Sequence, residues 1–255
     1  MPPLLKLDSI TINFGGLTAV DTVSFEVERG KIFALIGPNG AGKSTVFNII
    51  SGIYSPTSGK VCFNGRDITG LKPHLITDLG IARTFQNIRL FKNMTVLDNV
   101  RIGCHTRSKS GFIGAVTSLK WVREEEKAVI KRSEEVLAVV GLLDRKEEIS
   151  KNLSYGDQRK LEIARALASS PELLLLDEPA AGMNANEKLG LMEMVNSIRR
   201  MGITILLVEH DMKFVMGISD YVIVLDYGQM ISSGTPEEVQ NDPVVIDAYL
   251  GKEAG

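Results

Sequence analysis

The sequence of 255 residues has no basic excess, no long apolar run and few cysteines. Its net charge of −2 gives none of the positive surface by which nucleic-acid-binding proteins attract phosphate backbones. No apolar stretch reaches the roughly 20 residues that a helix needs to cross a bilayer, and the first residues lack the long apolar segment of a signal peptide. We therefore expect a protein that stays in the cytosol and does not bind nucleic acid.

The two cysteines, Cys62 and Cys104, lack the spacing of metal ligands. We expect them to be buried or inert thiols in a reducing compartment. Hydrophobic residues make up 44% of the chain and charged residues 24%, which is typical of a globular protein. A chain of this length forms either one large domain or one domain with a subdomain.

A glycine-rich loop fits the phosphate-binding pattern of a glycine, four residues and then Gly-Lys-Ser. It consists of Gly37, Pro38, Asn39, Gly40, Ala41, Gly42, Lys43, Ser44 and Thr45. Glycines let backbone N–H groups come close to phosphate oxygens. Lys43 provides a charge for the β- and γ-phosphates, and the Ser44 hydroxyl is placed to bind Mg²⁺. An apolar strand over 31–36 and a helix over 43–51 flank the loop, which predicts a nucleotide site.

Two residues at the ends of predicted strands have both an ordinary and a functional interpretation. Strands over 5–14 and 20–28 would pair antiparallel, and Phe14 at the end of the first can pack in the core or offer its ring to a base. Gln86 follows a predicted strand over 81–85. A lone glutamine there is ordinarily solvated, so its meaning depends on what it faces.

Helical patterns replace strands from about residue 94 to residue 150, which predicts a helical subdomain inserted into the nucleotide-binding core. The stretch that follows is Leu153-Ser154-Tyr155-Gly156-Asp157-Gln158. Ser154 has the pattern of a helix N-cap. The stretch is either a well-capped helix start or, with Gly156, a second anion-binding end.

Two carboxylates end the apolar run of residues 173–176, which predicts a central parallel strand whose carboxyl end faces the ligand. Asp177 can hold Mg²⁺ through water, and Glu178 can orient or deprotonate the attacking water. Acidic residues also end strands for no functional reason, so the pair gains its meaning from the phosphate loop. His210 follows an apolar strand over 203–208 and would reach a γ-phosphate from the same sheet edge.

In this order, the motifs resemble those of the nucleotide-binding subunit of ATP-binding cassette (ABC) transporters, over nearly the whole chain. Residues 37–45 match the Walker A loop, 173–178 the Walker B strand with its catalytic glutamate, and 153–158 the signature motif. Gln86 matches the Q-loop and His210 the switch histidine. The resemblance implies an α/β fold, a P-loop NTPase (RecA-like) core with an antiparallel β subdomain and an inserted helical subdomain.

The implied single ABC ATPase domain has internal divisions. The nucleotide-binding core with its β subdomain would cover about residues 1–93 and 165–235, the helical signature subdomain about 94–164, and a C-terminal helical tail 236–255. A Walker A loop alone is found in many phosphate-binding enzymes. A signature motif ahead of the Walker B strand restricts the choice of family far more.

The resemblance also implies roles in ATP hydrolysis. Two cassettes would close head to tail, so that Ser154 and Gly156 of one contact the γ-phosphate held by Lys43 of the other. Phe14 would stack on adenine. The implied Mg²⁺ ligands are Ser44, Gln86 and Asp177. The implied catalytic residues are Glu178, His210 and Gln86, of which the last would also link the site to the membrane subunits.

The sequence departs from the family pattern in places. The signature reads Leu-Ser-Tyr-Gly-Asp-Gln where Leu-Ser-Gly-Gly-Gln is usual, so Tyr155 replaces a glycine and Asp157 is a further departure. Asn184 stands where an aspartate is usual. These departures leave open how two cassettes are coupled, and do not affect the expectation that ATP binds.

Several stretches are similar to the LivG-type ATPase subunits of bacterial branched-chain amino-acid importers. They are Arg83-Thr84-Phe85-Gln86, Glu178-Pro179-Ala180-Ala181-Gly182, Glu209-His210-Asp211-Met212 and Ala248-Tyr249-Leu250-Gly251. This similarity implies a second related ATPase, two transmembrane permeases and an extracytoplasmic amino-acid binding protein as partners. It also implies a peripheral position on the cytoplasmic face of the inner or plasma membrane.

Two other functions remain open. A related ABC ATPase would serve another cargo, in urea or amide uptake or in lipopolysaccharide extraction. A soluble ABC ATPase acting on DNA or ribosomes would show long heptad arms or two cassettes in one chain, and the sequence has neither. The motifs do not specify the cargo, its direction, or whether the chain pairs with itself or with a related ATPase.

Overall fold

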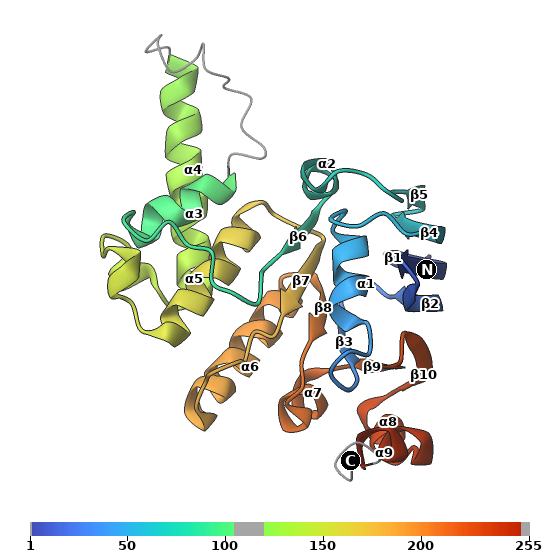
Figure 1. Ribbon diagram of the computed structural model, residues 1–255. Helices are drawn as coiled ribbons and strands as arrows, with labels where there is room; N and C mark the ends of the chain where they lie inside the picture. The colour runs from blue at the N-terminus through green and yellow to red at the C-terminus, as the bar shows by residue number, and fades with distance from the viewer. Residues whose placement is uncertain (1, 105–119, 251–255) are drawn as a thin grey trace.

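The computed structural model describes residues 2–104 and 120–250, and Figure 1 shows them as sheets with helices around and beside them. The strands are β1 (Leu5–Phe14), β2 (Leu17–Val27), β3 (Ile32–Ile36), β4 (Ser58–Phe63), β5 (Arg66–Asp67), β6 (Ile81–Arg83), β7 (Leu173–Asp177), β8 (Thr204–Val208), β9 (Tyr221–Asp226) and β10 (Gln229–Gly234). The α-helices are α1 (Lys43–Ile50), α2 (Pro73–Asp78), α3 (Val96–Cys104), α4 (Lys120–Val139), α5 (Tyr155–Ala168), α6 (Ala185–Arg200), α7 (Met212–Ile218), α8 (Pro236–Gln240) and α9 (Pro243–Leu250). Short 3₁₀ helices are η2 (Leu143–Arg145) and η3 (Ser150–Asn152).

The larger sheet has the strand order β10-β9-β3-β8-β7-β6, in which β10 is antiparallel to β9 and the other pairs are parallel. Its central strands are continuous apolar runs because both faces are covered. Every residue of β3, β7 and β8 is buried. Since parallel strands end at the same edge, the loops that follow these strands meet there.

Side chains of the central strands alternate between two hydrophobic cores, one on each face of the sheet. In β3, Ile32, Ala34 and Ile36 belong to the core that includes α5, α6 and α7. Phe33 and Leu35 belong to the core around α1 and the smaller antiparallel sheet, whose strand order is β2-β1-β4-β5. The predicted α/β core with an antiparallel sheet beside it is confirmed.

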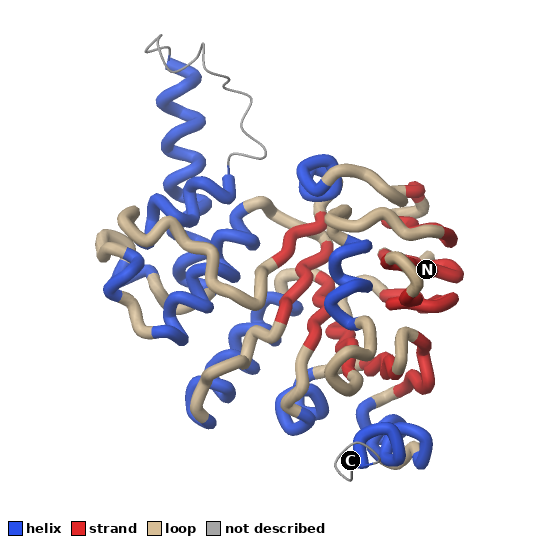
Figure 2. The backbone as a smooth tube through the Cα atoms, viewed as in Figure 1, coloured by secondary structure: helices blue, strands red, loops and turns tan. Residues whose placement is uncertain are grey.

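Helices α3, α4 and α5 pack against one another on the side of the molecule away from the smaller sheet (Figure 2). Their contact includes the buried residues Val100, Leu137 and Leu161. The division of the chain into core, helical subdomain and tail stays a prediction. Its boundary at residue 164 falls inside α5, and residues 105–119 and 251–255 lie outside the described part.

The strand predicted over 81–85 ends at Arg83. Beyond it, the carbonyl groups of Phe85 and Gln86 accept hydrogen bonds from the side chain of Arg159 instead of from a neighbouring strand. Within the two described ranges, no helix combines the length and the apolar character needed to cross a bilayer.

Candidate nucleotide-binding site

The loop between β3 and α1 requires glycine at two positions because other backbone segments come close to it. An added Cβ at Gly37 would lie 2.0 Å from the carbonyl oxygen of Leu225, and one at Gly42 would lie 2.8 Å from that of Ala19. Both glycines have positive φ, 146° and 99°, and Gly42 is the N-cap of α1. This is the backbone that a phosphate cradle requires, with N–H groups and a helix N-terminus at one place.

Lys43, the first residue of α1, lies across its own loop. Its Nζ donates hydrogen bonds to the carbonyl oxygens of Gly37 (2.7 Å) and Pro38 (2.8 Å). A positive charge is therefore held where the sequence predicted one for phosphates. The loop borders a cavity of about 310 Å³. The lining residues are Leu17, Thr18, Ala19, Asn39, Gly40, Ala41, Gly42, Lys43, Ser44, Thr45, Glu178 and Tyr227.

Glu178 lines the same cavity from the end of β7. Its φ of 47° is left-handed, which is uncommon for a residue other than glycine. Nε2 of Gln86 donates a hydrogen bond to Oε2 of Glu178 at 3.0 Å. Two of the predicted catalytic residues are thus in direct contact, and one of them shares a cavity with Lys43 and Ser44.

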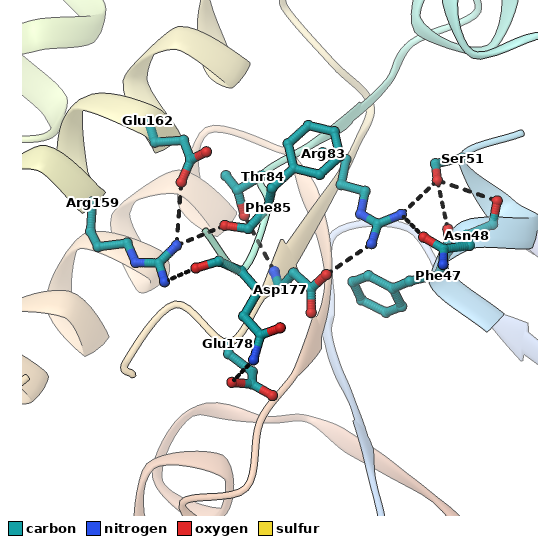
Figure 3. Close-up of polar contacts among 11 residues, drawn as sticks. Phe47, Asn48, Ser51, Arg83, Thr84, Phe85, Arg159, Glu162, Asp177 and Glu178 are labelled. Atoms are coloured by element: carbon teal, nitrogen blue, oxygen red, sulfur yellow. Dashed lines mark hydrogen bonds and ion pairs between the residues drawn. The ribbon is translucent and has the colours of Figure 1, made fainter. Parts of the chain in front are cut away.

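Asp177, a predicted Mg²⁺ ligand, is buried at the end of β7 and paired with Arg83 of the neighbouring strand. Nη2 of Arg83 donates to Oδ2 of Asp177 at 2.8 Å (Figure 3). Nη1 donates to Oδ1 of Asn48 and to Oγ of Ser51, both at 2.8 Å, so the arginine also reaches α1. The sequence does not predict this contact, because neither β6 nor β7 alone indicates that the two strands pair.

His210 follows β8 at the same sheet edge, but its side chain is 65% exposed and it is not among the cavity's lining residues. Its backbone N–H donates to Oε2 of Glu209 at 3.1 Å, and Oε1 of Glu209 accepts from the N–H of Ala180 at 2.7 Å. Burial raises the pKa of Glu209. Glu209, which the sequence indicated only as part of a family-like stretch, thus ties His210 to the turn after Glu178.

Ser154 caps α5 as its pattern predicts, but it is not among the residues that line the cavity. Its hydroxyl accepts from the N–H of Asp157 at 3.2 Å and donates to Oδ2 of Asp157 at 2.9 Å. Burial alone would raise the pKa of Asp157. Hydrogen bonds from Lys160 and Ser154, together with the positive charges of Lys160 and Arg145, outweigh this effect, so the pKa of Asp157 lies below its usual range. Gly156 lies against α6, where an added Cβ would be 3.1 Å from Oε1 of Glu187.

Phe14 makes an edge-to-face contact with Tyr54, with ring centroids 5.2 Å apart. It is 45% exposed and is not among the residues that line the cavity. Leu17 and Tyr227, which no sequence motif indicated, do line it and are 68% and 77% exposed. Their only sequence signal is their place next to the glycines of two turns: Leu17 begins β2 after Gly15-Gly16, and Tyr227 precedes Gly228.

The ABC transporter family model matches residues 20–181, and the model described as branched-chain amino acid ATP-binding cassette transporter matches residues 229–255. The chain is 45% identical over 251 residues to the high-affinity branched-chain amino acid transport ATP-binding protein LivG of Salmonella typhimurium, a match that covers 98% of each protein. It is 41% identical to the corresponding protein BraF of Pseudomonas aeruginosa, with the same coverage. A solved ATP-binding cassette of an ABC transporter in its ADP conformation has a TM-score of 0.86 and 33% identity, covering 98% of this chain and 100% of that one.

Proposed function

This chain belongs to the ABC transporter family of ATP-binding proteins, and we propose that it hydrolyses ATP to drive the import of branched-chain amino acids. The observation that carries the proposal is one cavity whose wall combines the phosphate loop with Glu178. The cargo is supported by the likeness to LivG and BraF and by the family match at residues 229–255.

In this proposal, the phosphates of ATP bind to the loop of residues 37–45. Oxygens of the β- and γ-phosphates take the place of the Gly37 and Pro38 carbonyls as hydrogen-bond acceptors of Lys43. Adenine lies at the side of the cavity formed by Leu17 and Tyr227. Phe14 joins them there if its ring leaves Tyr54.

The donors near the phosphate loop fit Mg²⁺, which prefers oxygen ligands. Ser44 offers a hydroxyl in the cavity wall, Asp177 a carboxylate at the end of β7, and Gln86 a side-chain amide. When bound, Mg²⁺ neutralises charge on the phosphates. The hydrogen bond from Arg83 fixes the orientation of the Asp177 carboxylate.

Hydrolysis in this proposal uses Glu178 as the general base that takes a proton from the attacking water. The hydrogen bond from Gln86 sets the direction of its carboxylate. For His210 to contact the γ-phosphate, its side chain has to move toward the cavity. In this structure the side chain is largely exposed and is not among those that line the cavity.

A partner cassette would complete the site with its own Ser154 and Gly156. We propose this pairing because neither residue is part of the cavity of its own chain. The test is the mass in solution, by light scattering, of a Glu178→Gln chain with ATP and with ADP. Doubling of the mass in ATP alone supports a site shared between two copies. A chain that binds ATP yet stays monomeric indicates a second, related ATPase as the partner.

We place the chain on the cytoplasmic face of the membrane, attached to two permeases that receive their cargo from an extracytoplasmic binding protein. The test is uptake of radiolabelled leucine by cells that carry the whole transporter, with either the natural chain or Glu178→Gln. Leucine uptake that depends on Glu178 supports the cargo. Unchanged leucine uptake would favour the alternative cargoes, urea or amides and lipopolysaccharide.

A further inference from the structure

One face of α5 presents charged side chains to a stretch of chain without helix or strand, residues 84–91. Arg159, Glu162 and Arg165 stand three residues apart, so they project from the same side of the helix. All three form hydrogen bonds with main-chain atoms of residues 85–89, which we call the Gln86 segment. The position of this segment therefore depends on α5.

Arg159 holds the first end of the segment. Its Nη1 donates to the carbonyl oxygen of Phe85 at 2.7 Å, and its Nη2 donates to the carbonyl oxygen of Gln86 (Figure 3). The side chain is 3% exposed, and Oε2 of Glu162 lies 3.4 Å from Nη1. A planar guanidinium holds two acceptors in a fixed relation to each other, which the ammonium group of lysine does not.

Glu162 and Arg165 hold the other end of the segment at Arg89. Oε1 of Glu162 accepts a hydrogen bond from the N–H of Arg89 at 3.3 Å, and Nη1 of Arg165 donates to the carbonyl oxygen of Arg89. These hydrogen bonds give partners to main-chain groups of residues 85–89, which lie outside any strand. The N–H of Thr84 still donates to the carbonyl oxygen of Leu175 in β7. The charged face of α5 thus supplies the hydrogen-bond partners of the chain beyond Thr84.

We propose that Arg159 is a positioning residue, which keeps the backbone of Gln86 where the Gln86 side chain reaches Glu178. The contact that depends on this position is the 3.0 Å hydrogen bond from Nε2 of Gln86 to Oε2 of Glu178. Because α5 begins in the signature stretch, any displacement of α5 moves the Gln86 carbonyl with it and alters this hydrogen bond. The inference rests on the proposed function, in which Gln86 and Glu178 act on the attacking water.

Tyr155 strengthens this link at a position where a glycine is usual in the family. Its hydroxyl accepts a hydrogen bond from Nη2 of Arg159 at 3.1 Å, and the guanidinium lies 5.6 Å from the centre of its ring. An added Cβ at Gly182, in the turn after Glu178, would lie 3.1 Å from Cε1 of Tyr155. Tyr155 therefore joins the start of α5 to the Gln86 segment through Arg159, and to the turn after Glu178 directly.

Hydrogen exchange in the purified chain without nucleotide tests the structural half of this proposal. Arg159→Met should speed exchange of the amides in residues 85–89 while leaving those of α1 unchanged. Arg159→Lys should give an intermediate result, since an ammonium can still donate to one carbonyl. The matched control is Arg200→Met, which removes an exposed arginine at the end of α6 and should leave residues 85–89 unchanged.

ATP turnover tests the functional half in a double-variant cycle with Gln86→Ala. Arg159→Met should lower kcat between about 10- and 100-fold, the cost of a misplaced group. ATP affinity should stay within about threefold, because the phosphate loop is untouched. In the Gln86→Ala background, the same change should have no further effect on kcat, a result that a general structural role does not give. Arg159→Lys replaces Arg159→Met in the cycle if the methionine variant does not fold.

Unchanged exchange at residues 85–89, or losses in kcat that multiply in the double variant, would overturn the assignment. These outcomes are separate from failure of the proposed function. A natural chain that binds no ATP would refute that function, and the exchange experiment, which needs no nucleotide, would still decide the role of Arg159.

Discussion

Breaking the pair between Arg83 and Asp177 is expected to destabilise the protein strongly, whereas removing both charges together should not. The two side chains are only 9% and 8% exposed, and they lie 2.8 Å apart. Replacing Asp177 with leucine leaves a buried guanidinium without its counter-charge. Replacing Arg83 with methionine leaves a buried carboxylate, and also removes the hydrogen bonds to Asn48 and Ser51.

The magnitude follows from the burial of the pair. Removing one partner of a buried ion pair costs about 3–5 kcal/mol, because the remaining charge stays out of water. For a chain of this size each kcal/mol lowers the midpoint of thermal unfolding by about 2–4 °C, so each single variant should lose roughly 6–20 °C. The Arg83→Met/Asp177→Leu double variant should recover most of this loss, because methionine fills the space between the rings of Phe47 and Phe85 with apolar atoms.

Urea unfolding without nucleotide or Mg²⁺ measures these free energies for the natural chain, both single variants and the double variant. The matched control is Arg29→Met, which breaks the exposed pair between Arg29 and Glu172 and should cost far less. Single variants no less stable than this control would refute the reasoning from burial. A double variant whose loss equals the sum of the single losses would refute the interaction itself.

Two further predictions concern backbone space and pH. Gly37→Ala should weaken ATP binding more than Gly40→Ala, although both glycines have positive φ. A Cβ at Gly37 would lie 2.0 Å from the Leu225 carbonyl oxygen, whereas one at Gly40 would have nothing within 4 Å. Equal losses of affinity in titrations with a fluorescent ATP analogue would contradict this prediction. Hydrogen bonds from Lys188 and the N–H of Phe214 hold the pKa of Asp211 below its usual range. The charge of Asp211 therefore contributes stability above about pH 3.9, its pKa in the unfolded chain, and this contribution is lost as the pH falls through its lower pKa in the folded chain. The natural chain should therefore be more stable than Asp211→Asn in urea at pH 7 and equal to it in acid, and a difference that persists in acid would count against the ion pair as its source.

The sequence predicted those parts of the fold that local patterns determine. Apolar runs predicted strands at β3, β7 and β8, and the run at β7 predicted a central parallel strand, because strands covered on both faces are continuous apolar runs. The phosphate loop was predicted from its glycines, and its flanking strand and helix lie close to the expected ranges. The strand before Gln86 is shorter than predicted. Its last hydrogen bond to β7 is at Thr84, and the carbonyls of Phe85 and Gln86 are bonded by Arg159 of α5 instead.

Contacts between distant segments were not predictable in the same way. Nothing in the residues around Arg83 indicates that it faces Asp177, since the contact depends on β6 pairing with β7. The hydrogen bonds from Arg159 to the Gln86 segment join residues more than 70 positions apart. Gln86 itself was singled out through the family resemblance and its place at a strand end, and its contact with Glu178 appears only in three dimensions.

The most direct test of the proposed ATPase is to separate ATP binding from ATP turnover at Glu178. Glu178→Gln keeps the shape of the side chain but removes its basicity, so ATP should bind with unchanged affinity while turnover falls by about 10²–10⁴-fold. The matched control is Glu172→Gln, the same change beside the opposite end of β7, which should turn over ATP normally. Turnover in Glu178→Gln equal to that of the control would contradict the assignment of Glu178 as the base, and with it the mechanism built on this cavity.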